Sequence, residues 1–230
     1  MKRRTFGKTG EWVRKRVNYL HQRFFPQENV RNNEYGLGES DWERSYQRGR
    51  WDFLNHPEQL AHYSVIIGYI TYYRKNGAIL DVGCGEGILL DRMCACSYSR
   101  YVGIDVSETA INKALKKKME KCAFAKTSVQ DFKSEEKFDA IVLNEVLYYF
   151  ENPMQILEHC KTFLKDNGIL IVSMYCSEET SELWKKIESV YAPLEETKIS
   201  NRDNTSWVCK AYRSSKDLHL KSDDKDQGIN

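Results

Sequence analysis

The chain has 230 residues and a formal net charge of +2, with 41% hydrophobic and 30% charged residues, an ordinary balance for a soluble domain. Its length suits one domain with a substantial core, and its short apolar runs exclude a membrane-spanning helix. Lys2-Arg3-Arg4 is not followed by an apolar segment, so we expect no secretory signal. The cysteines have no paired C-x-x-C spacing, which favours reduced thiols, a cytoplasmic protein and no metal site. They are Cys84, Cys94, Cys96, Cys122, Cys160, Cys176 and Cys209.

Residues 1–23 form a basic segment in which aromatic side chains are interleaved with lysine and arginine. Such a segment can bind RNA by phosphate contacts and stacking, or an anionic substrate or membrane surface. It is also typical of a solvated amphipathic helix, which is the interpretation we favour. The alternatives make nucleic acid a conceivable partner but not the favoured one.

Two helices are predicted between this segment and the first strand. The first covers residues 39–50. The second is opened by Pro57 and places one face toward the core; that face holds Leu60, Tyr63, Ser64, Ile67 and Ile70. Residues 1–77 are therefore expected to form a basic segment followed by an aromatic-rich helical lid.

The stretch 79–87 combines an apolar run, an acidic residue and three alternating glycines, and helical spacing of apolar residues follows it. This pattern predicts a strand, a tight loop and a helix. Glycine allows positive φ and close approach of a ligand, and a helix that begins there directs unpaired N–H groups into the same space. We therefore expect a cradle for a nucleotide-type ligand.

The spacing in this loop separates two kinds of cradle. The dinucleotide fingerprint is G-x-G-x-x-G, whereas here Gly83, Gly85 and Gly87 give G-x-G-x-G and Ile88 takes the place of the third glycine. Asp81 is a poor neighbour for a pyrophosphate but suits a ligand that carries an ammonium group. The stretch resembles the first motif of class I S-adenosylmethionine-dependent methyltransferases.

A second acidic residue follows at the distance of one helix and one strand. Residues 101–105 form an apolar strand that ends in Asp105, whose carboxylate can accept hydrogen bonds from both ribose hydroxyls, as in dinucleotide folds. Ser107 is a good N-cap for the next helix. The buried stripe of that helix is predicted to contain Ala110, Ile111, Ala114, Leu115 and Met119.

Residues 122–128 are predicted to form a third strand, and the adenine contact is expected just after it. Members of the resembled family usually place an acidic residue there. In this sequence that position falls on Ser128, and Asp131 comes three residues later. Two alternatives stay open: Ser128 and the backbone near Val129 make the contact, or Asp131 reaches back to make it.

Residues 138–144 are apolar throughout, as expected for a buried parallel strand, and end in Asn144. Ligands bind at the carboxyl ends of such strands, so Glu145 is the candidate that binds an amine acceptor or takes its proton. Tyr148 lies one helical turn later and shares that pocket. The string Glu145 to Tyr149 resembles small-molecule methyltransferases, including nodulation-type N-methyltransferases acting on amino sugars.

Downstream, we predict a helix from Pro153 to about residue 164, a turn at residues 166–168, a strand at 168–174 and a helix at 179–191. Residues 195–200 and 206–212 follow as a hairpin. The polar residues 214–230 are predicted to be disordered. The oligomeric state is not predictable from the sequence.

The resemblance implies an α/β, Rossmann-like sheet over residues 78–213, mostly parallel with a C-terminal antiparallel hairpin and helices on both faces. It also implies S-adenosyl-L-methionine as cofactor. In that site the backbone at Gly83, Cys84, Gly85 and Gly87 approaches the amino-acid end of the donor. Asp81 holds its ammonium, and Asp105 holds the ribose. Val106 packs on the adenine, and Asn144 lies beside the methionyl part.

The expected reaction is transfer of a methyl group to an N or O nucleophile of a small molecule, such as an amino sugar, a sugar or another metabolite. A single domain with an aromatic lid favours a small-molecule acceptor. One alternative is an RNA or protein methyltransferase that uses the basic N-terminal segment. Another is a non-catalytic nucleotide-binding or NAD-dependent protein.

Overall fold

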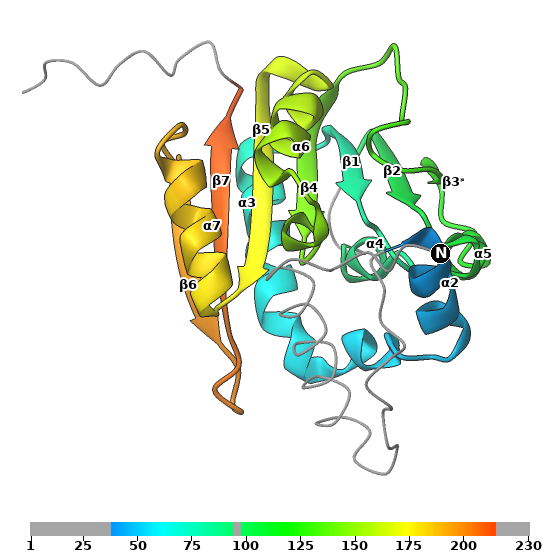
Figure 1. Ribbon diagram of the computed structural model, residues 1–230. Coiled ribbons are helices and arrows are strands. Elements are labelled where there is room, and N and C mark those ends of the chain that lie inside the picture. The colour runs from blue at the N-terminus through cyan, green and yellow to red at the C-terminus, as the bar shows by residue number, and fades with distance from the viewer. Residues whose placement is uncertain (1–37, 94–97, 215–230) are drawn as a thin grey trace, which may run out of the picture.

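The computed structural model describes residues 38–93 and 98–214 (Figure 1). The elements, in chain order, are α2 (Glu39–Gln47), the 3-10 helices η1 (Asp52–Asn55) and η2 (Pro57–Gln59), α3 (Leu60–Arg74), β1 (Ala78–Val82), α4 (Ile88–Arg92), β2 (Arg100–Asp105), α5 (Glu108–Leu115), β3 (Cys122–Lys126), β4 (Phe138–Asn144), the 3-10 helix η3 (Leu147–Tyr149), α6 (Pro153–Lys161), β5 (Leu164–Tyr175), α7 (Glu178–Glu188), β6 (Glu195–Ser200) and β7 (Ser206–Arg213). The basic segment, Cys94, Cys96 and residues 215–230 lie outside the described part of the chain.

Seven strands form one sheet in the order β3-β2-β1-β4-β5-β7-β6. The strands β1 to β5 pair in parallel, whereas β7 runs antiparallel to both β5 and β6. The strand order reverses between β1 and β4, and the crevice outside the carboxyl ends at such a point is where ligands bind in open α/β sheets. The predicted fold class, with its terminal antiparallel hairpin, is confirmed.

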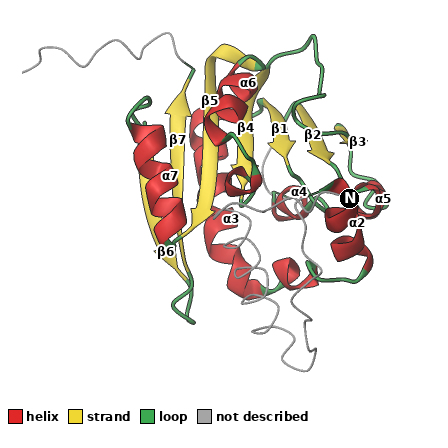
Figure 2. Cartoon of the chain, viewed as in Figure 1, coloured by secondary structure: helices red, strands yellow, loops and turns green. Residues whose placement is uncertain are grey.

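Alternate residues of the central strands point into two separate apolar cores, as the period of two in a strand requires. Leu80 and Ile141 belong to the core that α6 and α7 cover. Ile79 and Val142 belong to the core that α3 and α4 cover. Figure 2 shows the resulting three layers, with the sheet between helices on its two faces.

The buried face of α3 matches the predicted one at Tyr63 and Ile70 and differs from it elsewhere. Its buried residues are His62, Tyr63, Ile66 and Ile70, whereas Leu60 is 49% exposed. The face is rotated because His62 is fully buried between the rings of Tyr63 and Trp207. Hydrophobic periodicity alone treats a histidine as polar and therefore misplaces the face.

The structure also differs from the prediction at α5 and at β5. The helix α5 ends at Leu115, which is half exposed, so its buried stripe holds Ala110, Ile111 and Ala114 only. The predicted turn at residues 166–168 lies inside β5. There the pairing with β4 shifts register: Phe138 pairs with Leu164, whereas Ala140 pairs with Ile169. The residues of β5 between these two pairs form a bulge-like irregularity within the strand.

No helix within the described residues is long and apolar enough to cross a bilayer. The same residues contain no group of three or more histidine, cysteine or acidic side chains placed to hold a metal ion.

Candidate functional site

The glycine loop between β1 and α4 depends on backbone conformations that only glycine adopts without strain. Gly83, Gly85 and Gly87 have φ angles of 71°, 53° and 75°. A Cβ on Gly83 would lie 2.6 Å from Cγ2 of Val146, and one on Gly85 would lie 2.6 Å from Oη of Tyr46. The loop is therefore packed closely against two segments far away in the chain.

The N–H groups of this loop are used inside the fold. Those of Gly83 and Cys84 donate to the carbonyl oxygen of Ile104 at 2.8 and 3.0 Å, and that of Gly87 donates to the carbonyl of Cys84 at 3.0 Å. The N–H of Gly85 donates to the carboxylate of Asp105 at 2.9 Å. The predicted unpaired N–H groups were those of the helix that begins after the loop, a prediction that these four loop residues do not test. The four loop N–H groups themselves are not available to bind a pyrophosphate.

Close contacts at Cys84 and Gly87 show how the glycine loop packs on the neighbouring strands. The Cys84 side chain is buried, and its sulfur would lie 2.8 Å from a Cβ on Gly103. A Cβ on Gly87 would lie 3.2 Å from the ring of Phe124. Cys84 and Gly87 thus fix the packing of the loop on β2 and β3, and they face the fold's interior.

Asp81 is buried in β1 and accepts a hydrogen bond from the phenol of Tyr101 on β2. Burial raises the pKa of Asp81 to about 7, although the bond from Tyr101 opposes this shift, and the nearby charge of Asp105 adds to it. The structure thus places Asp81 next to the loop, as predicted, and gives its carboxyl group a titration near neutral pH.

Asp105, the last residue of β2, holds two backbone segments in place. Its Oδ2 accepts from the N–H of Gly85 and its Oδ1 accepts from the N–H of Ser107, each at 2.9 Å. Burial raises the pKa of Asp105 to about 6, against the lowering effect of these bonds. Since a carboxylate oxygen can accept more than one hydrogen bond, both oxygens keep capacity for ribose hydroxyls. Val106 follows Asp105 and is partly buried.

The two candidates for the adenine contact lie together after β3. The hydroxyl of Ser128 donates to Oδ2 of Asp131 at 2.7 Å, and the N–H of Asp131 donates back to that hydroxyl at 3.1 Å. These bonds join the two candidates to each other and do not decide between the two alternatives for the adenine contact. Val129 between them is 3% exposed, so its side chain belongs to the core.

Asn144, Glu145 and Tyr148 come together at the carboxyl end of β4. The hydroxyl of Tyr148 donates to Oε2 of Glu145 at 2.9 Å. Glu145 has a φ of 57°, a conformation that costs a non-glycine residue about 1–2 kcal/mol. Oδ1 of Asn144 is buried and has no hydrogen-bond partner among the described residues. A strained residue and an unsatisfied acceptor at one place indicate a functional site.

Three aromatic residues before β1 reach this edge of the sheet and were missed as site residues. Tyr46 of α2 lies over Gly85. Trp42 of α2 contacts the ring of Tyr149 edge-on, with 4.6 Å between centroids. Tyr63 of α3 interacts with Asn144, and burial raises the pKa of its phenol. The sequence showed an aromatic-rich lid, but no motif indicated which rings face the loop.

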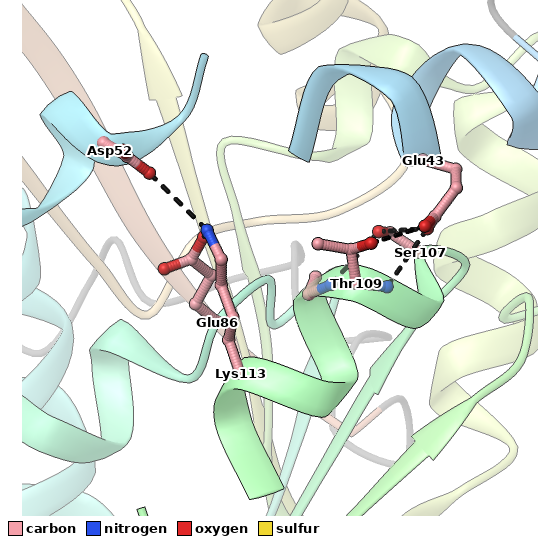
Figure 3. A network of polar contacts seen from close by, with 7 residues as sticks. Glu43, Asp52, Glu86, Ser107, Thr109 and Lys113 are labelled. Atoms are coloured by element: carbon pink, nitrogen blue, oxygen red, sulfur yellow. Dashed lines mark hydrogen bonds and ion pairs between the residues drawn. The ribbon is translucent and has the colours of Figure 1, made fainter. Parts of the chain in front are cut away.

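Polar side chains of the same region were also missed. Glu43 of α2 points at the start of α5, where Ser107 and Thr109 lie (Figure 3). Lys113 of α5 forms an ion pair with Glu86 of the glycine loop, 2.6 Å between Nζ and Oε1. These contacts join segments more than 25 residues apart, and no local spacing predicts them.

Comparison with known proteins agrees with these observations. A family model described as "Methyltransferase domain" matches residues 73–221, well over half of the chain. The ubiquinone biosynthesis O-methyltransferase of Actinobacillus pleuropneumoniae serotype 7 is 34% identical over 104 residues, which cover 41% of this chain and 44% of that protein. The ribosomal protein L11 methyltransferase of Staphylococcus haemolyticus is 29% identical over 149 residues, 60% of this chain and 44% of that protein. The matches thus cover less than half the length of these two relatives.

A solved structure shares the fold over most of its length. The N-methyltransferase NodS from Bradyrhizobium japonicum, in complex with S-adenosyl-L-homocysteine, superposes with a TM-score of 0.63 and 20% identity, covering 75% of this chain and 98% of that one. Its fold is the one predicted from the glycine loop and from Asp105. The chain belongs to the methyltransferase domain family, and its fold is that of the class I S-adenosyl-L-methionine-dependent methyltransferases.

Proposed function

We propose that this protein transfers a methyl group from S-adenosyl-L-methionine to an N or O nucleophile of a small molecule. The observation that carries the proposal is an acidic, acceptor-rich edge at the point where the strand order reverses. Asp81, Asp105 and Glu145 lie there, while four of the five N–H groups of the loop at residues 83–87 already donate within the fold. Such an edge suits a donor with sulfonium and ammonium charges and disfavours the pyrophosphate of NAD.

The residues present fit the donor. Oδ1 of Asn144, a buried acceptor with no partner in the described chain, suits the donor ammonium together with Asp81. Asp105 accepts from the ribose hydroxyls. Val106 packs against the adenine, and Ser128, Asp131 and the Val129 backbone lie beyond β3 to contact its edge. In this arrangement residues 78–213 carry the donor site, and residues 38–77 cover it.

When bound, the donor would supply a methyl group on a cationic sulfonium, whose sulfur leaves as a neutral thioether. The protein has to align donor and acceptor, exclude water and remove one proton from the acceptor. Glu145 is the side chain we assign to the acceptor. It acts as counter-ion to an amine or removes the acceptor's proton. Tyr148, which donates to its Oε2, holds that carboxylate in one orientation. The aromatic rings of Trp42 and Tyr149 pack together beside this pair and exclude water.

The fold alone does not establish the reaction, because one fold hosts many activities. Binding is tested first, by calorimetry with S-adenosyl-L-homocysteine and with NADH. We expect the first to bind and the second not to bind. Binding of NADH alone would overturn the donor assignment.

The acceptor is then identified by screening amines, sugars and phenols with a donor that carries a labelled methyl group. Label in one of these classes is the expected outcome. The relative that methylates ribosomal protein L11 motivates a second candidate, a protein acceptor. Label incorporated only into protein or RNA would therefore replace the small-molecule proposal and leave the donor site in place.

A further inference from the structure

Glu43 receives an unusual number of hydrogen bonds for a side chain on a lid helix. Its Oε2 accepts from the hydroxyl of Ser107 at 2.7 Å and from the N–H of Thr109 at 3.1 Å. Its Oε1 accepts from the hydroxyl of Thr109 at 2.5 Å and from the amide of Gln47 at 2.9 Å. Three of the four donors belong to Ser107 and Thr109 at the start of α5, which Glu43 faces directly (Figure 3).

The position of this carboxylate has a clear physical basis. The first turn of a helix has unsatisfied N–H groups and a partial positive charge, so it attracts an anion. Burial acts to raise the pKa of Glu43, but the bonds from Thr109, Ser107 and Gln47 outweigh it and lower the pKa to about 2. The charged form is therefore the one that holds α2 to α5 throughout the physiological pH range.

A second contact joins the same elements. Nζ of Lys113, on α5, lies 2.6 Å from Oε1 of Glu86 in the glycine loop and 3.6 Å from Oδ1 of Asp52 in η1. The lid segment, the glycine loop and α5 are thus connected through one ammonium group. Together the Glu43 and Lys113 contacts fix both ends of the stretch 43–52 against α5.

The residue placed by these contacts is Tyr46, one helical turn after Glu43. It is 8% exposed, and its hydroxyl lies over Gly85, 2.6 Å from where a Cβ would be. Gly85 in turn donates its N–H to Asp105. By holding α2 on α5, the carboxylate of Glu43 therefore helps to set where Tyr46 contacts the glycine loop next to Asp105.

We propose that Glu43 is a positioning residue of the donor site, which docks the lid helix α2 on the start of α5 and so slows release of the cofactor. The inference rests on the proposed function, since it assumes that the donor lies between the glycine loop and Asp105. Glu43 itself acts through Thr109, Ser107 and Tyr46.

The test compares S-adenosyl-L-homocysteine binding of full-length variants by calorimetry and stopped-flow fluorescence. Glu43→Gln removes the charge, and we expect its Kd to rise about tenfold, which corresponds to ~1.4 kcal/mol. Most of this change should appear as faster dissociation. Thr109→Val removes one donor to Glu43 and should raise the Kd about threefold, whereas Thr109→Ser keeps the hydroxyl and should restore wild-type binding.

Glu39→Gln is the matched control. Glu39 lies on the same helix and pairs with Lys126, but both side chains are exposed, so its loss should change the Kd less than twofold. The double variant Glu43→Gln/Thr109→Val should bind less weakly than the product of the two single effects, because both substitutions weaken the same contact between residues 43 and 109.

The outcomes separate the two proposals. Wild-type protein that fails to bind S-adenosyl-L-homocysteine would refute the donor site and the proposed function. Wild-type binding with an unchanged Kd in Glu43→Gln would overturn the positioning role alone. Additive effects of Glu43→Gln and Thr109→Val, or equal loss in Thr109→Ser and Thr109→Val, would do the same. Circular dichroism checks that each variant is folded, and the Thr109 pair keeps the test decisive if Glu43→Gln does not fold.

Discussion

The phenol of Tyr101 donates a hydrogen bond to the carboxylate of Asp81 across the neighbouring strands β1 and β2. Both side chains are buried, at 0% and 2% exposure. A carboxyl group in such a place is costly to ionise, and Tyr101 supplies partial compensation for its charge. The ionisation of Asp81 is therefore balanced near neutral pH, with a pKa of about 7.

This balance predicts that donor affinity depends on pH. The ammonium of S-adenosyl-L-homocysteine favours ionised Asp81, so its Kd should fall as pH rises from 5.5 to 7.5, by up to about tenfold per unit. Asp105, with a pKa of about 6, acts in the same direction. Tyr101→Phe should shift the midpoint to higher pH. Calorimetry across this range tests the prediction, and a flat profile in wild-type protein would contradict it.

The same shift predicts the opposite trend for the stability of the protein without ligand. The pKa of Asp81 is raised from 3.8 to about 7 on folding, so the folded state binds this proton more tightly than the unfolded state. The free energy of unfolding should therefore decrease as pH rises from about 4 to about 7, by up to ~1.4 kcal/mol per unit. Urea titrations of wild-type protein and Asp81→Asn measure it, and the variant should lack this component.

Removing the Asp105 carboxylate should weaken the donor site more than any other single change at β2. Asp105→Ala loses the acceptor of the Gly85 and Ser107 N–H groups as well as the ribose contacts. Hydrogen bonds to charged groups contribute about 1.5–3 kcal/mol each, so we expect the Kd for S-adenosyl-L-homocysteine to rise at least ~100-fold. Asp166→Ala, at an exposed position in the first half of β5, is the control. Unchanged affinity in Asp105→Ala would mean that its role is misassigned.

The candidate donor residues could be predicted to lie together because local spacing places each of them near a strand end. Gly83 and Gly85 follow β1 and Asp105 ends β2, and a parallel sheet brings those ends to one edge. What the spacing did not reveal is how the loop's N–H groups are used. Three of them donate to Ile104 or Asp105 on the neighbouring strand, so this pairing depends on the register of β1 and β2.

The lid was predictable as a segment and not as a set of contacts. Trp42, Tyr46 and Tyr63 are aromatic residues in predicted helices, and their composition indicated a covering element. Glu43 carried no signal, because its partners Ser107 and Thr109 lie 64 and 66 residues away. A glutamate on a helix surface that contacts only solvent and one that caps another helix cannot be told apart from the sequence, because only the tertiary contact distinguishes them.

Glu145 should show a conflict between stability and function. It adopts a φ of 57°, which glycine tolerates and alanine does not. Glu145→Gly should therefore be about 1 kcal/mol more stable than Glu145→Ala, or ~2–4 °C higher in Tm for a chain of this size. Both variants should bind S-adenosyl-L-homocysteine like wild type and lose methyl transfer to the acceptor found by screening.

Tyr148→Phe provides the matching test of the acceptor side. It keeps the ring in its packing position and removes the hydroxyl that donates to Glu145. We expect kcat to fall while donor affinity is unchanged. Full methyl transfer by Glu145→Ala would contradict the assignment of this carboxylate to the acceptor.

Gly85→Ala should displace the lid, and a second substitution should reverse part of the effect. The new Cβ would lie 2.6 Å from Oη of Tyr46 but 3.6 Å from its Cζ, so only the hydroxyl is in the way. We expect Gly85→Ala to bind S-adenosyl-L-homocysteine more than ~10-fold more weakly and to be destabilised by about 1–3 kcal/mol.

Adding Tyr46→Phe removes the clashing oxygen and should recover most of the steric component in the double variant. The cost of placing alanine at a φ of 53°, about 1 kcal/mol, would remain. Gly83→Ala is the control, because its Cβ meets Val146, and Tyr46→Phe should not rescue it. Equal rescue of both alanine variants would show that Tyr46→Phe acts by a general loosening of the lid. Rescue of Gly85→Ala alone would show that the Tyr46 hydroxyl lies against the glycine loop in solution.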